Sequence, residues 1–261
     1  MELSIYIYLV LLVLCSLIGF LGGLLGIALG AIRLPLIIFL GVEPIIAAST
    51  NLLAVIFGSL AGLFPAIKQK RVPIRSTLNI AFPSMLAAFL GGYFASNIAE
   101  IYLLIIIIAC LIISGLVMIF YQIDSKELKN DNKSTAKEIL VGVVVSYFGG
   151  IVGLALGVLR VPALVYFLKM NIKTAGGINL FLSVLVGISA YLGHSFSGNF
   201  DYILIFCVVF PTILGMYFGS RFVKIVDDKQ LRKILGITLL ILSVILFVRE
   251  PVSYTHLRAH E

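Results

Sequence analysis

The chain of 261 residues consists almost entirely of long apolar runs separated by short polar gaps. Hydrophobic residues make up 61% of the sequence and charged residues 12%, whereas a soluble domain is typically about half apolar and about a quarter charged. A helix needs about 20 apolar residues to cross a bilayer. The sequence therefore predicts an all-α polytopic membrane protein with about eight apolar segments. They span residues 3–41, 44–66, 74–98, 101–122, 137–168, 174–196, 200–220 and 230–249.

The two halves of the chain repeat each other. The segment GFLGGLLGIALGAIRLPLI, residues 19–37, aligns with SYFGGIVGLALGVLRVPAL, residues 146–164, at a constant offset of 127 residues. An internal duplication of this kind is a common way to build transporters. The matched pairs are Gly22 and Gly149, Gly23 and Gly150, Gly26 and Gly153, Gly30 and Gly157, Arg33 and Arg160, Pro35 and Pro162, and, one inserted residue later, Asn51 and Asn179.

We predict two homologous transmembrane repeats joined by a polar segment. Residues 1–122 form the first repeat, residues 123–137 a mixed-charge cytoplasmic linker, and residues 138–251 the second repeat. Residues 252–261, VSYTHLRAHE, match nothing else in the chain, and we interpret them as a non-native tail. Glu2 has the wrong charge for the start of a signal peptide, so we expect the first apolar run to be retained.

Two apolar runs, residues 3–41 and 137–168, are too long for one span and short for two. Each contains the Gly-rich stretch followed by Arg-x-Pro, and both Gly and Pro weaken a helix interior. We interpret each run as a broken hairpin of one longer helix and one half-helix, which starts close to the proline. Tight helix packing is the alternative explanation for the glycines. The residues expected at the breaks, where they would act in gating, are Gly22, Gly23, Gly26, Gly30, Pro35, Gly149, Gly150, Gly153, Gly157 and Pro162.

Basic loop residues swap sides between the halves. The gap after residues 44–66 is basic, whereas its repeat equivalent, residues 193–201, contains no Lys or Arg. The gap after residues 74–98 also lacks them, whereas its equivalent, residues 221–233, contains five. Because cytoplasmic loops are enriched in Lys and Arg, the pattern predicts oppositely oriented halves with both termini outside. The alternative is a plain eight-span arrangement, which would place residues 221–233 outside.

Several functions are disfavoured by the composition. The net charge of +7 comes mostly from Lys and Arg in the polar gaps, so it indicates cytoplasmic loops and no nucleic-acid partner. Cys15, Cys110 and Cys207 are far apart in apolar runs, and neither a metal site nor a cofactor is indicated. Nothing in the sequence resembles a catalytic set, so we do not expect an enzyme. No Asp or Glu lies deep in an apolar run, which disfavours proton coupling through a buried carboxylate.

Arg33 and Arg160 are the most informative side chains, because a charge inside an apolar run is costly. In the hairpin arrangement both lie near the middle of the bilayer, and the repeat symmetry brings them to one site. Two guanidinium groups suit a small oxyanion, since each can donate two hydrogen bonds. We expect Asn51, Asn179 and Thr50 to add neutral donors. The alternatives are that the arginines snorkel or cap helix ends and that the asparagines only join helices.

With these motifs the chain resembles the sulfite exporter TauE/SafE family, which is marked by a doubled motif similar to G-G-x-x-G-x-G-G-G-x-x-x-x-P-x-L. Here it reads GGLLGIALGAIRLPLI and GGIVGLALGVLRVPAL, and the resemblance covers about residues 1–250. Where such proteins often have a run of glycines, this chain has Ala28-Leu29 and Ala155-Leu156. The resemblance implies transport of sulfite, an organosulfonate or another small organic anion.

We therefore predict a permease that moves a small anion across the cytoplasmic membrane. Two alternatives stay open at this point, namely a channel-like anion pore and a non-transporting membrane subunit that needs a partner. A pore would show flux that does not saturate with substrate. A subunit would co-purify with its partner and show no flux alone.

Overall fold

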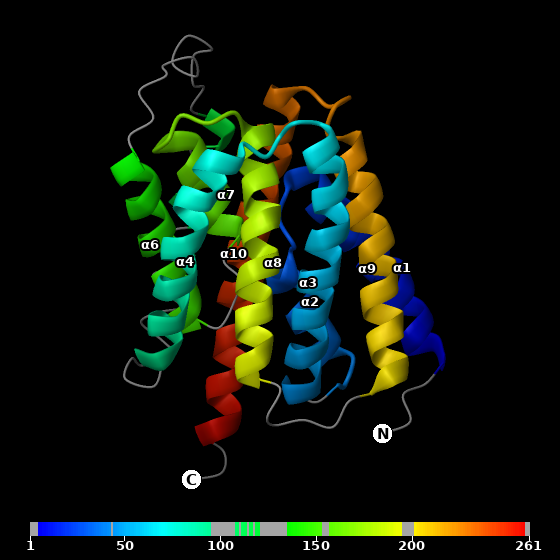
Figure 1. Ribbon diagram of the computed structural model, residues 1–261. Coiled ribbons are helices and arrows are strands. Elements are labelled where there is room, and N and C mark those ends of the chain that lie inside the picture. Colours follow the sequence, from blue (N-terminus) through cyan, green and yellow to red (C-terminus); the bar gives the residue numbers. More distant parts are fainter. Residues whose placement is uncertain are drawn as a thin grey trace.

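The computed structural model describes residues 5–42, 44–94, 108–109, 111–113, 115–116, 118–120, 135–152, 157–194 and 201–258. All regular structure within these residues is helical (Figure 1). The helices are α1 (Ile5–Leu25), α2 (Gly30–Phe39), α3 (Pro44–Lys68), α4 (Ile74–Phe94), α6 (Thr135–Val152), α7 (Gly157–Tyr166), α8 (Ile172–His194), α9 (Tyr202–Phe222) and α10 (Asp228–Arg258). The described parts of residues 108–120 are also helical.

Several of these helices are suited to a membrane. Among the described residues, the segments long and apolar enough to cross a bilayer are Ile5–Leu25, Ser49–Lys68, Ile172–Ser189 and Tyr202–Phe222. Shorter apolar helices cover Ile74–Leu90, Leu111–Phe120 and Gly157–Tyr166. The predicted all-helical membrane fold is confirmed at this level. The number of eight segments and the opposite orientation of the halves stay predictions.

The outer surface of the bundle is apolar. Leu9 and Val13 on α1, and Phe82, Leu86 and Phe89 on α4, are each more than half exposed. Their spacing of three or four residues places them on one face of each helix. Soluble proteins rarely expose contiguous apolar patches of this kind, so these faces are suited to contact with lipid.

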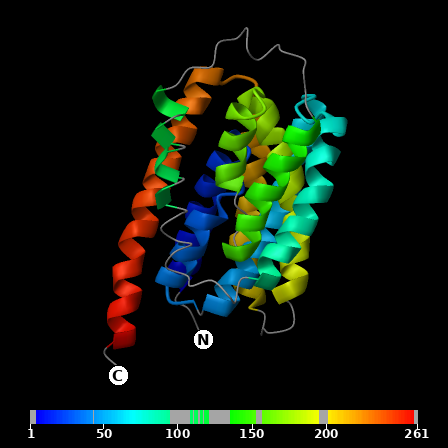
Figure 2. The ribbon, with the colours of Figure 1, turned by 90° about the vertical axis from the view of Figure 1, so that its left-hand side faces the viewer.

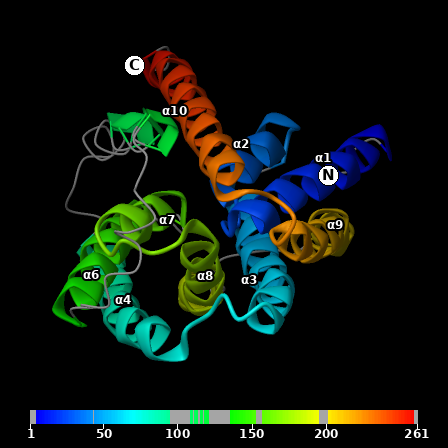
Figure 3. The same ribbon diagram turned by 90° about the horizontal axis from the view of Figure 1, so that it is seen from above.

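Equivalent helices of the two repeats pack in equivalent ways. Helix α1 packs against α9 of the other repeat. The duplication aligns α1 with α6 and α9 with α4, and α6 packs against α4 in the same way. The equivalent helices α3 and α8 pack against each other in the middle (Figure 3). The two repeats therefore interleave, and the buried core is built from both.

Small residues allow α1 and α9 to approach closely. Gly19 and Gly23 on α1 face the backbone of α9, and Gly215 and Gly219 on α9 face the backbone of α1. A Cβ atom added at Gly19 would lie 2.9 Å from the carbonyl oxygen of Thr212. Small residues commonly bring membrane helices together in this way. Packing is therefore a sufficient explanation for Gly23, which the sequence placed among the residues of the helix break.

The turns at one end of the bundle are held together by polar contacts. Residues 69–73, 167–171 and 223–227 all lie at the top of Figures 1 and 2, opposite the first residues of α1 and the end of α10. Arg71 donates hydrogen bonds to the Ser220 hydroxyl at 2.7 Å and to its backbone carbonyl at 3.0 Å. This end of the bundle is where the loops rich in Lys and Arg meet.

Two of the predicted boundaries fall inside helices. Helix α6 begins at Thr135, within residues 123–137, which we assigned to the linker, and residues 121–134 lie outside the described part. Helix α10 continues to Arg258, past the start of residues 252–261. The domain limits and the origin of the tail stay predictions.

Candidate functional site

The first helical hairpin is interrupted between α1, which ends at Leu25, and α2, which begins at Gly30. Gly26, with φ of 73°, and Leu29, with φ of 44°, both have left-handed backbone in this break. Such a conformation is uncommon for leucine. Gly26 also lies against the backbone of Gly176 on α8, which leaves no room for a side chain. The break is therefore a defined turn that is packed against the other repeat.

The second hairpin has the same layout. Helix α6 ends at Val152, and α7 begins at Gly157, which is 127 residues after Gly30. Helices α2 and α7 are both ten residues long. Residues 153–156, which include Gly153, lie outside the described residues. The duplication seen in the sequence thus produces two half-helices that begin at equivalent glycines.

The residues predicted at the breaks occupy different positions. Gly26 lies in the first break, and Gly30 and Gly157 begin the half-helices. The others lie within helices: Gly22 and Gly23 in α1, Gly149 and Gly150 in α6, Pro35 in α2 and Pro162 in α7. Our prediction that the half-helices start close to the prolines was wrong. They begin five residues earlier, and in the first repeat this start directly follows the left-handed turn between Gly26 and Leu29.

Arg33 lies on the first turns of α2, and its side chain is fully buried. Its Nη2 atom donates a hydrogen bond to the carbonyl oxygen of Ala28 at 2.8 Å, and its Nη1 atom donates to Oδ1 of Asn51 on α3 at 3.4 Å. At 0% exposure the side chain does not snorkel to the end of the bundle. The bond to Ala28 also gives Arg33 a structural role in the helix break.

Arg160 occupies the equivalent position on α7 and is 1% exposed. Its Nη1 atom donates a hydrogen bond to Oδ1 of Asn179 on α8 at 3.0 Å. Its Nη2 atom donates to the hydroxyl of Ser146 on α6 at 3.5 Å. The two repeats therefore contain the same pair, a buried arginine bonded to a buried asparagine on the following helix.

A further hydrogen bond connects the two pairs. The side-chain Nδ2 atom of Asn179 donates to the carbonyl oxygen of Gly26 at 2.7 Å. Ala28, two residues later, accepts the bond from Arg33. Arg33 is therefore bonded directly to the short break between α1 and α2. Arg160 is connected to the same break through Asn179.

The glycines that begin the half-helices make room for the asparagines. A Cβ atom added at Gly30 would lie 3.0 Å from Nδ2 of Asn51. A Cβ atom at Gly157 would lie 2.7 Å from Nδ2 of Asn179. Both distances are too short for a side chain without displacement of the asparagine. The two asparagines therefore lie directly against the N-terminal ends of α2 and α7.

The site is electropositive and lacks a counter-charge within the described residues. Neither Arg33 nor Arg160 pairs with an acidic side chain there, and the Nε atom of each makes no hydrogen bond with the described protein. Buried cations without a partner are unfavourable in a medium of low dielectric. The N-terminal ends of two half-helices add further positive potential. Such an arrangement can stabilise an anion.

Some residues near the site were not expected from the sequence, and one expected residue is not in the network. Ser146 was not predicted, although it opens the second copy of the motif. Thr50 is buried next to Asn51 but is not part of the hydrogen bonds just described. Glu138 is not part of this network either: at the start of an apolar run, it is only 2% exposed and accepts a hydrogen bond from Asn79 at 2.9 Å. A buried carboxylate was not expected, because we placed this residue at the edge of the linker.

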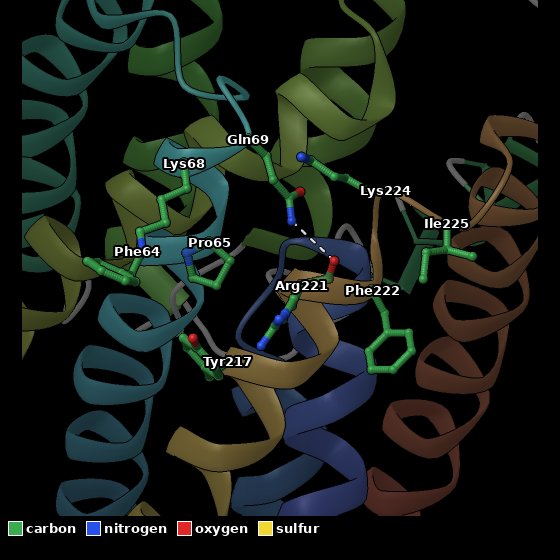
Figure 4. A pocket seen from close by; sticks show the side chains of 9 residues that line it. All are labelled: Phe64, Pro65, Lys68, Gln69, Tyr217, Arg221, Phe222, Lys224 and Ile225. Atoms are coloured by element: carbon green, nitrogen blue, oxygen red, sulfur yellow. Dashed lines mark hydrogen bonds between the residues drawn. The ribbon is translucent and has the colours of Figure 1, made fainter.

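A cavity lies away from the two arginines. It has a volume of about 520 Å³ and opens at the basic end of the bundle, between α3 and α9 (Figure 4). Neither Arg33 nor Arg160 lines it. The arginine pair is therefore closed off from this cavity by packed protein.

The comparisons with known proteins find one family model and several related transporters. A family model described as sulfite exporter TauE/SafE matches residues 11–246. The probable membrane transporter protein YunE of Bacillus subtilis is 25% identical over 90% of this chain and 96% of its own. The probable membrane transporter protein YjnA of the same organism is 26% identical over 86% of this chain and 93% of its own. The probable membrane transporter protein MJ0441 of Methanocaldococcus jannaschii is 22% identical over 84% and 87%. No solved structure is significantly similar.

Proposed function

Because the chain belongs to the sulfite exporter TauE/SafE family, we propose that it is a permease that carries a small anion, such as sulfite or an organosulfonate, across the cytoplasmic membrane. Its relatives are named as probable membrane transporters, and its apolar helices fit a multi-pass membrane protein. In this proposal Arg33 and Arg160 bind the anion, and Asn51, Asn179 and Thr50 complete the site.

One observation carries the proposal, namely the two buried arginine–asparagine pairs at equivalent places in the two repeats. A single buried arginine is often a structural residue that satisfies backbone carbonyls. Two of them, attached to one helix break and without acidic partners among the described residues, leave positive charge that an anion can neutralise. Where only packing is needed, apolar side chains of similar volume are often at least as stable as buried charges.

The chemistry of the site suits an oxyanion. A guanidinium group is planar and offers several N–H donors in a fixed geometry, which matches the oxygen atoms of sulfite or a sulfonate. The Nε atoms of Arg33 and Arg160 still have the capacity to donate. Amide groups of asparagine add donors without adding charge. We infer a substrate with at least two oxygen acceptors that is negatively charged at neutral pH.

An opposite orientation of the repeats is part of this proposal. Helix α3 ends at the basic end of the bundle with Lys68, whereas its repeat equivalent α8 starts there, next to Lys173 (Figure 1). Arg71, just after α3, donates to the backbone carbonyl of Lys173 at 3.5 Å, which is consistent with this placement. The positive-inside rule assigns this end to the cytoplasm. Transporters built from inverted repeats commonly bind substrate at the repeat interface, near interrupted helices.

The burial of the site favours a gated carrier over an open pore. Arg33 and Arg160 are both closed off by packed side chains, so an anion reaches them only if the helices move. The break between α1 and α2 is the element that we propose moves, since residues 26–29 belong to neither helix and connect directly to both arginine–asparagine pairs. This predicts flux that saturates with substrate.

The test is sulfite flux into proteoliposomes under an imposed membrane potential. The variants are Arg33→Gln, Arg160→Gln and the double variant, each checked for folding by gel filtration and circular dichroism. Arg75→Gln is the matched control, because Arg75 is an exposed arginine at the basic end of the bundle. We expect saturable flux in the wild type and the control, and a loss of about 100-fold or more in the folded site variants.

Other outcomes would change the proposal in defined ways. Full flux in the folded double variant would remove Arg33 and Arg160 from the substrate site. Flux that rises linearly with sulfite would replace the carrier with a pore. If sulfite does not move but an organosulfonate does, the site stands and the substrate changes.

A further inference from the structure

The cavity at the basic end of the bundle lies between the last turn of α3 and the last turn of α9 (Figure 4). Its volume of about 520 Å³ is within the range of roughly 300–1,000 Å³ that is usual for small-molecule sites. Gln69, just after α3, donates a hydrogen bond to the backbone carbonyl oxygen of Arg221 at 3.1 Å. This bond connects the two walls, so the cavity is part of the packed structure of the helix ends.

The cavity is strongly basic. Lys68, Arg221 and Lys224 line it, and no acidic residue is among its lining residues. The Nζ atom of Lys68 lies 4.5 Å from the centre of the Phe64 ring, which holds this ammonium group beside the cavity. Three cationic side chains, from α3, from α9 and from the turn after α9, line one space, and cations of this kind suit a phosphate group.

Exposed apolar residues continue from the cavity along both helices. Phe64 lines the cavity, and Leu60 and Phe57 lie one and two turns deeper on α3, at 50% and 46% exposure. On α9, Leu214 and Phe210 are 42% and 46% exposed. Their spacing places each row on one helix face. Because these faces belong to a membrane protein, the rows run from a basic cavity into the lipid.

We propose that this cavity binds the phosphate headgroup of an anionic phospholipid, whose acyl chains lie along the exposed rows of α3 and α9. A basic pocket between transmembrane helices at the positively charged end is suited to such a headgroup. A soluble anion would use the three cations but would gain nothing from the apolar rows. The inference does not depend on the anion site at Arg33 and Arg160, which do not line this cavity.

The test uses the full chain, purified in a neutral detergent and titrated with phosphatidylglycerol, with the thermal unfolding midpoint as readout. The cavity variant is Lys68→Gln/Arg221→Gln/Lys224→Gln. We expect phosphatidylglycerol to raise the midpoint of the wild type. The cavity variant should need about 100-fold more lipid, because each basic residue near an anionic lipid contributes roughly fivefold.

The matched control removes the same charge from the same end of the bundle. Arg75→Gln/Lys229→Gln/Lys233→Gln changes three exposed basic residues that do not line the cavity, and we expect it to respond as the wild type does. If the triple cavity variant does not fold, Lys68→Gln and Lys224→Gln are measured separately, with an expected loss of about fivefold each.

Three further ligands distinguish the source of the phosphate. Phosphatidylcholine, inorganic phosphate and glycerophosphoglycerol, the soluble headgroup alone, should each leave the midpoint almost unchanged at concentrations where phosphatidylglycerol acts. An equal response to phosphatidylcholine would show that the negative charge is not recognised. An equal response to inorganic phosphate or to the soluble headgroup would show that the cavity binds free anions. An equal loss in the control variant would show diffuse attraction. Each of these results overturns the proposal.

Discussion

The side chain of Asn179 donates a 2.7 Å hydrogen bond to the carbonyl oxygen of Gly26, so a residue of the second repeat fixes the helix break of the first. The same amide group accepts a hydrogen bond from Arg160 through its Oδ1 atom. One asparagine therefore determines both where the arginine lies and how the break is held. Its repeat equivalent, Asn51, accepts a bond from Arg33, while the residue equivalent to Gly26 lies outside the described part of the chain.

Asn179→Ala is expected to destabilise the protein more than Asn51→Ala. The first substitution removes two hydrogen bonds of 2.7 and 3.0 Å and leaves a buried carbonyl and a buried guanidinium nitrogen with fewer partners. We expect a cost of roughly 2–4 kcal/mol. Among the described residues, the second removes the longer bond of 3.4 Å to Arg33, at a cost of about 1 kcal/mol. Reversible unfolding in mixed micelles measures both, and equal losses would contradict the bridging role of Asn179.

Asn51→Asp tests whether the positive charge of Arg33 is needed for transport. A carboxylate at this position would lie beside the guanidinium group of Arg33, since Oδ1 of Asn51 already accepts its hydrogen bond. The new ion pair would neutralise the charge that we assign to the substrate. We expect a folded protein whose anion flux falls about 100-fold or more.

Asn51→Ser is the control for this substitution, because it shortens the side chain without adding charge. We expect Asn51→Ser to keep more flux than Asn51→Asp when both are measured in proteoliposomes. If the aspartate variant transports as fast as the wild type, the charge of Arg33 is not used by the substrate.

The sequence singled out these arginines and asparagines because the duplication aligned them. Arg33 with Arg160 and Asn51 with Asn179 were matched by their offsets alone, and the structure brings each Arg to the Asn of its own repeat. The contact between the repeats, from Asn179 to Gly26, was not predictable in this way. It depends on how α8 packs beside the first hairpin, and an offset within one chain carries no information about packing between its halves.

Our prediction of where the half-helices start was wrong for a different reason. Proline is common at the first position of a helix, and we placed the starts near Pro35 and Pro162 on that basis. The actual starts, Gly30 and Gly157, leave space for Asn51 and Asn179, and Gly30 also directly follows the turn between Gly26 and Leu29. Spacing of residue types indicates that a helix is interrupted, but the residue at which it resumes depends on its neighbours.

Arg71→Met is expected to lower stability by roughly 2–4 kcal/mol, because the guanidinium group joins the turn after α3 to the end of α9. It donates to the hydroxyl and the carbonyl of Ser220 and, through Nε, to Oε1 of Gln69 at 2.9 Å. Arg75→Met is the control at an exposed position nearby, and we expect a change of less than about 0.5 kcal/mol. Similar losses for the two variants would contradict this role of Arg71.

The same residue gives a prediction for pH. Burial lowers the pKa of Arg71 to about 10. Because the pKa is lower in the folded protein than in the unfolded chain, the unfolded chain binds more protons above about pH 10, and stability from this group rises with pH only there. Between about pH 6 and pH 9 Arg71 is protonated in both states. The stability difference between the wild type and Arg71→Met should therefore be constant in that range, and a difference that changes with pH would show that Arg71 titrates earlier.

Gly26→Ala should be among the most damaging small substitutions in this protein. Gly26 has φ of 73°, which is strained for alanine, and its Cβ atom would also collide with the backbone of Gly176. Strain alone costs about 1–2 kcal/mol. The collision would push the break away from α8 and lengthen the hydrogen bond from Asn179 to Gly26. We therefore expect a total loss of more than about 3 kcal/mol, together with loss of anion flux.

Gly41→Ala separates the cost of backbone strain from the cost of the collision with α8. Gly41 has φ of 92°, but a Cβ atom there would meet nothing within 4 Å, so only the backbone strain applies. We expect a loss of about 1–2 kcal/mol and unchanged flux per folded molecule. Thermal unfolding and proteoliposome flux are measured for both variants. If Gly26→Ala costs no more than Gly41→Ala, the close contact between the break and α8 is not important. If it costs more but transports normally, the contact stabilises the fold and the break has no part in transport.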